Sequence, residues 1–246
     1  MRQLLPRASD RVDPYDAYRP DDPHAPFLRL NMVASADGAV TDRRGRSGGL
    51  GGDGDRVVFR ALRALADAVL VGAGTVRAEK YGPHRPPEAL AARRFADGRA
   101  RPAAIVVVSQ SLDVDIGAPL FTEAEVPTVV LTCAASDPDR RAAIERVGRL
   151  VVAGDARVDL AAGLTGLRER LGCAHVLCEG GPTLNAALLA AGLVDELCLT
   201  VAPQLMGGSG PRLAADLEPS RDLDLIAVCE QDGELLLRYR LTREWP

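Results

Sequence analysis

The chain has 246 residues, of which 47% are hydrophobic and 26% charged, as is usual for a globular protein of one large domain or two small ones. The formal net charge of −4 and the lack of a basic tract argue against nucleic acid as the main partner. The N-terminus has no apolar core of a signal peptide, and no apolar run approaches the roughly 20 residues of a membrane span. We therefore expect a cytoplasmic protein that does not bind a membrane.

The cysteines and histidines predict neither disulfides nor a metal site. The five cysteines are odd in number and lack CxxC spacing, which favours reduced thiols in the core. The three histidines are isolated from one another and from any pair of cysteines.

The N-terminal part predicts an arm followed by a strand, a turn and a loop. Residues 1–26 contain five prolines and five aspartates and few large apolar groups, so we expect an extended arm that Tyr15 and Tyr18 anchor. A single domain is predicted over residues 27–246. It opens with a strand at 27–35 and a turn at Asp37-Gly38.

Residues 43–55 contain six glycines and predict a long mobile loop. Such a loop either closes over a ligand or merely links two elements. A helix is expected from about Asp53, because Val58, Leu62 and Leu65 share one face.

The middle of the chain alternates between strands and helices. The Pro- and Arg-rich residues 83–102 are expected to form a loop. Strands are predicted at 68–72, 103–109, 128–132, 149–154 and 175–179, and helices at 137–147 and 159–171. This alternation predicts parallel strands with helices on both faces.

The C-terminal part breaks this alternation. A strand is expected within 195–205, and Asp232-Gly233 predicts a hairpin between two further strands. The fold class is therefore α/β, with a mixed, mostly parallel sheet and a C-terminal antiparallel hairpin.

The segment Glu179-Gly180-Gly181-Pro182 joins a strand to a helix. Pro182 suits the first helical position, and the two glycines let another group approach the main chain. A helix N-terminus offers free N–H groups and partial positive charge, so the turn favours an anion. The alternative is that the glycines only make a tight connection.

A second glycine turn, Gly72-Ala-Gly74-Thr75, also follows a strand. Arg77 stands at the third glycine position of GxGxxG, so this is no Rossmann fingerprint. Thr75 and Arg77 could hold phosphate oxygens, or Arg77 could be a solvated surface charge.

Asp37 and Glu179 are the candidate catalytic carboxylates. Each lies beside a glycine at a strand end, where an acid can orient hydroxyls, or donate a proton if burial raises its pKa. Asp before Gly is also common as a simple turn former. Because ligands gather beyond the carboxyl ends of strands, the Asp37 corner and the two glycine turns are expected around one crevice.

The motifs S-x-D-G (35–38), V-G-x-G-T (71–75) and E-G-G-P-T-L (179–184), in this order and spacing, resemble the pyrimidine reductase family of riboflavin biosynthesis. The resemblance runs from about residue 27 to the end. It implies a dihydrofolate-reductase-like fold, a homodimer, and NADPH as donor of a hydride to C1′ of a ribosylaminopyrimidine phosphate.

The resemblance also implies the roles of individual residues. Asp37 and Glu179 would face the substrate. The residues implied to contact NADPH are Gly72, Gly74, Thr75, Arg77, Glu79, Ser109, Gly180, Gly181, Pro182, Thr183 and Leu184. The substrate-binding positions are Asn31, Ser35 and Gly51.

The chain departs from the family pattern at two of these positions. Asn31 stands where bacterial members usually carry a lysine aimed at the pyrimidine, and Gly51 where a threonine is expected. The zinc deaminase motifs H-x-E and P-C-x-x-C do not occur, so a stand-alone reductase of a small heterocycle is expected. The alternatives are a dihydrofolate or dihydropterin reductase on the same scaffold, and a dinucleotide-binding sensor without turnover.

Overall fold

The structure, a computed structural model, describes residues 1–99 and 101–242. The chain divides into two compact units. Unit 1 comprises Met1–Asp22, Phe27–Leu62 and Cys178–Pro246, and unit 2 comprises Pro23–Pro26 and Arg63–Leu177. The prediction of a single domain over 27–246 stays a prediction.

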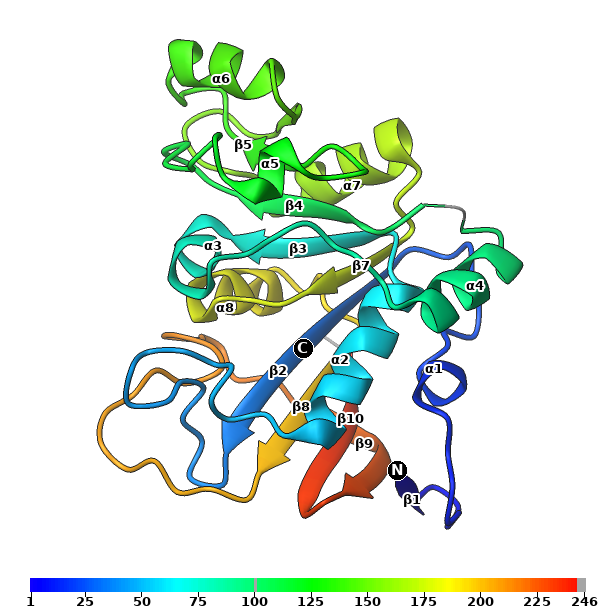
Figure 1. The fold of residues 1–246 in the computed structure, drawn as a ribbon. Coiled ribbons are helices and arrows are strands. Elements are labelled where there is room, and N and C mark those ends of the chain that lie inside the picture. The colour runs from blue at the N-terminus through cyan, green and yellow to red at the C-terminus, as the bar shows by residue number, and fades with distance from the viewer. Residues whose placement is uncertain (100, 243–246) are drawn as a thin grey trace. The chain divides into compact units, whose positions relative to one another are not determined.

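Unit 1 is built on a sheet with the strand order β1-β9-β10-β8-β2 (Figure 1). Its strands are β1 (Arg2–Leu5), β2 (Phe27–Ser35), β8 (Glu196–Ala202), β9 (Leu223–Gln231) and β10 (Glu234–Leu241). β2 and β8 run parallel, and the pairs β8/β10, β10/β9 and β9/β1 are antiparallel. Asp232 and Gly233, both with positive φ, join β9 to β10, so the predicted hairpin is confirmed.

The helices of unit 1 are α1 (Pro14–Ala17), α2 (Asp53–Leu65), whose last residues belong to unit 2, and α8 (Pro182–Ala190). Two of these, α2 and α8, begin where the sequence predicts them, whereas the short helix α1 lies in the segment predicted as an extended arm. Val58, Leu62 and Leu65 of α2 are all buried, as their shared spacing predicts.

Residues 1–22 of the N-terminal arm are part of unit 1. β1 covers the edge of β9, and Tyr15 and Tyr18 are each 1% exposed, which confirms them as anchors. Under the arm, Arg29 and Arg238 pair with Glu196 at 2.7 and 2.8 Å. Burial alone would raise the pKa of Glu196, but the two guanidinium groups outweigh it and lower the pKa to about 2.

Unit 2 carries a sheet with the order β7-β3-β4-β5-β6, in which β3 to β6 run parallel (Figure 1). Its strands are β3 (Ala68–Gly72), β4 (Ala104–Val108), β5 (Val129–Thr132), β6 (Arg149–Val152) and β7 (His175–Cys178), and its helices are α3 (Ala73–Glu79), α4 (Glu88–Ala96), α5 (Pro119–Thr122), α6 (Pro138–Glu145) and α7 (Leu160–Leu171). The strands and helices predicted from the alternating pattern are therefore confirmed.

The prediction of a loop over 83–102 is wrong in its centre, where α4 forms. The segment consists mostly of Ala, Leu, Arg and Glu, which are good helix formers, and its flanking prolines obscure this. A tertiary contact also fixes α4: the buried Arg94 guanidinium donates to the carbonyls of Ala64 and Ala66 at 2.5 and 2.7 Å. Arg94 thus satisfies carbonyl groups at the end of α2.

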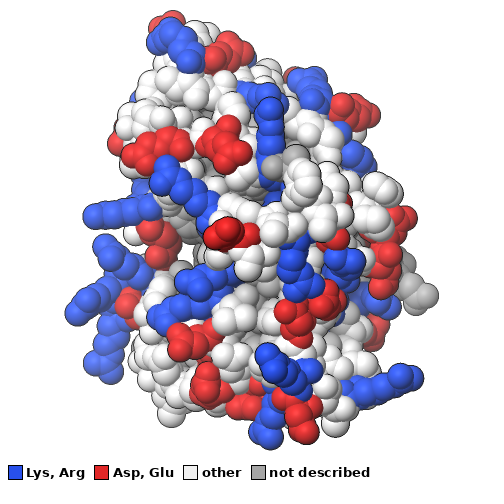
Figure 2. Space-filling view, turned by 45° about the vertical axis from the view of Figure 1, so that its right-hand side comes forward, with Lys and Arg blue, Asp and Glu red and all other residues white. Residues whose placement is uncertain are grey.

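The burial of the cysteines and the distribution of charged side chains on the surface agree with the composition. All five cysteines are buried free thiols. Figure 2 shows acidic and basic side chains interspersed over the visible face. Within the described residues, no helix has both the length and the apolar character that crossing a bilayer requires.

Candidate active site

The turn between β7 and α8 requires glycine at position 180. Gly180 has φ +86°, a conformation that costs other residues about 1–2 kcal/mol. A Cβ atom there would lie 3.3 Å from Met32 Sδ and 3.4 Å from Asn185 Nδ2. The peptide between Gly180 and Gly181 is cis. At position 180, therefore, the glycine serves the turn itself.

The N-terminus of α8 has main-chain donors that no side chain within the described residues caps. Gly181 is the N-cap residue without a side-chain hydrogen bond, and Pro182 lies in the first turn, as predicted. Thr183 is exposed and Leu184 is buried. Asn185, which is fully buried, donates to the carbonyl of Leu213 at 2.9 Å and fixes the helix against the loop after β8. This geometry suits an anion such as a diphosphate.

The carboxylate of Asp37 organises the corner after β2. It accepts hydrogen bonds from Ser35 Oγ at 2.5 Å, from the N–H of Met206 at 3.1 Å and from the N–H of Gly207 at 2.7 Å. The bond from Ser35, followed by those from Gly207 and Met206, lowers the pKa of Asp37 to about 2. Asp37 is exposed and ionised, so it is suited to accept hydrogen bonds and not to donate a proton.

The other residues predicted on the substrate side lie in unit 1 as well. Ser35 is 2% exposed, and its hydroxyl makes two hydrogen bonds. It donates to Asp37 and accepts from the N–H of Ala39 at 3.0 Å. Ser35 thus supports the corner. Asn31 and Glu179 are each 8% exposed.

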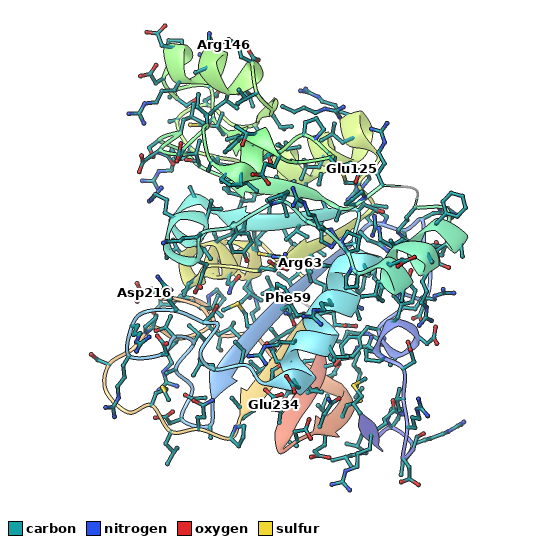
Figure 3. All side chains as sticks on the ribbon, in the orientation of Figure 1. Phe59, Arg63, Glu125, Arg146, Asp216 and Glu234 are labelled. Carbon is teal, nitrogen blue, oxygen red and sulfur yellow. The ribbon has the colours of Figure 1, made fainter. Side chains whose placement is uncertain are left out.

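The glycine-rich loop is attached to the sheet at its C-terminal end. Gln204 Nε2 donates to the carbonyl of Leu50 at 3.0 Å. Glu234 of β10, 3% exposed, accepts from the N–H of Gly52 at 2.7 Å and of Asp55 at 3.1 Å, and so caps α2 (Figure 3). A Cβ atom at Gly52 or Gly54 would lie 2.9 Å from Glu234 Oε2. These glycines allow the carboxylate to approach the main chain.

The remaining predicted cofactor residues lie in unit 2. Gly72 is the N-cap of α3, and a Cβ atom at the exposed Gly74 would meet nothing within 4 Å. Arg77 pairs with Asp113 at 3.2 Å and donates to its carbonyl at 2.6 Å, as an exposed surface charge does.

Three further predicted residues complete this part. Thr75 and Glu79 are partly exposed on α3, and Ser109, directly after β4, is 5% exposed. Within the described residues, no three His, Cys, Asp or Glu side chains are grouped to hold a metal ion.

Several polar residues of this region have no sequence signal. Gln204, Thr200 and Glu234 come from the C-terminal strands and the loop after β8, and Asp55 reads only as a helix start. These residues come close to the glycine-rich loop because strands far apart in the sequence pair in the sheet. No local sequence pattern predicts this pairing.

The fold and these sites define a dihydrofolate-reductase-like α/β protein of the reductase type. Residues 26–237 match the RibD C-terminal domain. The chain therefore belongs to the RibD C-terminal domain family, and a reductase of this family uses a hydride donor.

Individual relatives agree with this assignment. The chain is 34% identical over 196 residues to 2,5-diamino-6-ribosylamino-4(3H)-pyrimidinone 5′-phosphate reductase from Methanothermobacter thermautotrophicus, covering 78% of this chain and 85% of the relative. It is 29% identical to the Archaeoglobus fulgidus protein of the same name, covering 85% and 94%. A pyrimidine reductase-like protein from Corynebacterium diphtheriae has a similar structure, with a TM-score of 0.84, 27% identity and coverage of 95% and 100%.

Proposed function

We propose that this protein reduces a ribosylaminopyrimidine phosphate with NADPH. A hydride is added to C1′ of the ribose, one proton is taken up, and the ribose ring opens to a ribityl chain. The observation that carries this proposal is the glycine turn at 180–181 before the uncapped N-terminus of α8, whose free N–H groups suit the cofactor diphosphate.

Some residues of the chain bind NADPH in this proposal, and others position the chain around the substrate. Thr75, Glu79 and Ser109 are the further NADPH contacts that family membership supports. Asp37 holds residues 206–207 by accepting their N–H groups, and Glu179 is the buried carboxylate retained on the substrate side. NADPH supplies the hydride, and the chain supplies orientation and electrostatics.

The test is incubation of the purified protein with NADPH and the ribosylaminopyrimidine phosphate, following loss of NADPH absorbance and formation of the ribityl product. Dihydropterin and dihydrofolate are the comparison substrates. Binding of NADPH without consumption in all these mixtures would favour the sensor instead.

We also propose a homodimer formed through the C-terminal strands. Leu223, Leu225 and Leu235 are 39%, 46% and 40% exposed on β9 and β10, which leaves an apolar stripe uncovered. A second copy would cover it. Light scattering should show a dimer that Leu225→Lys dissociates, whereas Phe95→Lys on α4, also exposed, should leave it intact.

A further inference from the structure

Thr132, the last residue of β5, has a buried hydroxyl group without a partner. The residue is 0% exposed, and its Oγ1 makes no hydrogen bond within the described part of the chain. Its main-chain carbonyl is satisfied, because it accepts from the N–H of Ala153 at 2.8 Å. A buried hydroxyl without a partner is costly, and most buried polar groups in native proteins are paired. The hydroxyl of Thr132 therefore calls for an explanation.

The neighbouring strand places Ser109 level with Thr132. Val108 of β4 pairs with Leu131 of β5, and the N–H of Ser109 donates to the carbonyl of Leu131 at 3.0 Å, so the ladder continues one residue past β4. Residues in register on adjacent strands point to the same face, and the strands lie about 4.8 Å apart. A rotation about one side-chain bond therefore brings the hydroxyl of Thr132 within hydrogen-bond distance of Ser109 Oγ.

Both hydroxyl groups lie on the face of the sheet that is turned away from α7. A Cβ atom at Gly163 of α7 would lie 2.7 Å from Leu131 Cδ2, so Leu131 faces α7, and Thr132 points to the opposite face. Ser109 and Thr132 also stand at the carboxyl ends of parallel strands, the edge where ligands of α/β proteins bind. Ser109 is 5% exposed and Thr132 is completely enclosed, so a ligand at this edge can contact Ser109 but not Thr132.

Resting on the proposed reductase function, in which Ser109 contacts NADPH, we propose that Thr132 is a positioning residue for the cofactor. When the hydroxyl of Ser109 donates its hydrogen to the cofactor, its oxygen accepts the hydrogen of Thr132 Oγ1. Thr132 thereby fixes the Ser109 hydroxyl in the orientation that binds the cofactor, and hydroxyl groups linked in a chain strengthen one another. The hydroxyl of Thr132 pairs only in the complex, so cofactor binding relieves the cost of leaving it unpaired.

Thr132→Val tests this role, because valine replaces only the hydroxyl by a methyl group. Removing a hydroxyl that has no partner should leave the protein as stable as the parent or more stable in urea unfolding. NADPH affinity, measured by isothermal titration, should fall by about 3- to 10-fold, as expected for the loss of one neutral hydrogen bond. Thr132→Ser, which keeps the hydroxyl, should retain most of the affinity. Unchanged affinity in Thr132→Val overturns the proposal.

Thr128→Val is the matched control, at the residue directly before β5. Thr128 is also 0% exposed, but its Oγ1 donates to the carbonyl of Leu120 at 2.5 Å. This variant should lose stability and keep its NADPH affinity, the reverse of Thr132→Val. If Thr132→Val loses as much stability as Thr128→Val, the hydroxyl of Thr132 is already paired without the cofactor, and the proposal is overturned.

The double variant Ser109→Ala/Thr132→Val decides whether Thr132 acts through Ser109. Ser109→Ala should lower NADPH affinity, and adding Thr132→Val should lower it no further, because the hydroxyl of Thr132 then has no partner to hold. Additive losses overturn the positioning role. If Thr132→Val binds NADPH as well as the parent does, only this proposal fails, whereas a parent that binds no NADPH overturns the proposed function as well.

Discussion

Replacing Gly74 by alanine tests whether glycine at this position is needed for the fold or for binding a ligand. Gly74 is exposed in α3, its φ is not positive, and a new Cβ atom would meet nothing within 4 Å. Alanine is favoured over glycine in helices by up to about 1 kcal/mol. The variant should therefore be as stable as the parent or slightly more stable, with a melting temperature up to about 4 °C higher.

Cofactor binding should respond in the opposite direction. If the NADPH phosphates approach the main chain at Gly74, the added methyl group takes their space, and we expect at least about a tenfold loss of affinity, equivalent to about 1.4 kcal/mol. Isothermal titration with NADPH measures this loss directly. Because the protein alone has room for the methyl group, a loss of affinity must come from the ligand.

Gly180→Ala is the contrasting variant. Its positive φ costs about 1–2 kcal/mol, and the contacts with Met32 and Asn185 add to this, so both stability and NADPH affinity should fall. Urea unfolding and titration report the two effects separately. Unchanged NADPH affinity in Gly74→Ala would remove Gly74 from the cofactor site, and unchanged affinity in a folded Gly180→Ala would refute the diphosphate contact at α8.

Two further predictions concern charged groups. Asp37→Asn should keep NADPH affinity but lose most turnover, because an amide cannot accept from all three of the donors that fix the corner; equal loss of both would contradict its positioning role. Glu196→Gln should cost about 3–5 kcal/mol at pH 7, since it leaves the buried guanidinium group of Arg29 and the partly buried one of Arg238 without their carboxylate partner. The folded pKa of Glu196 is about 2, below the unfolded value of 4.5, so its stabilisation is present above pH 4.5 and lost as the pH falls through 2. The difference between parent and variant in urea unfolding should shrink over that window, and a constant difference would contradict the assignment.

Much of the candidate site follows from short motifs. Gly72 ends β3, Gly74 lies in the first turn of α3, and Gly180 and Gly181 lie between β7 and α8, so local rules alone place these glycines at strand-to-helix turns. The same rules give two meanings to Asp37, as a catalytic acid or as a turn former. The hydrogen bond from the nearby Ser35 and the N–H groups of residues 206 and 207, far away in sequence, together lower its pKa, and only the tertiary structure brings in the latter two.

The sequence by itself determines most strands and helices of this protein, the hairpin at Asp232-Gly233 and the family, because periodicity and turn chemistry are local. The tertiary structure decides what the polar groups do. Asp55, Thr200 and Glu234 come into contact only because α2 packs on β8 and β10. Arg94 donates a hydrogen bond to a carbonyl at the C-terminal end of α2 only because α4 folds beside that helix. A hydrogen bond or a desolvation energy depends on neighbours in space, and a pattern along the chain does not contain them.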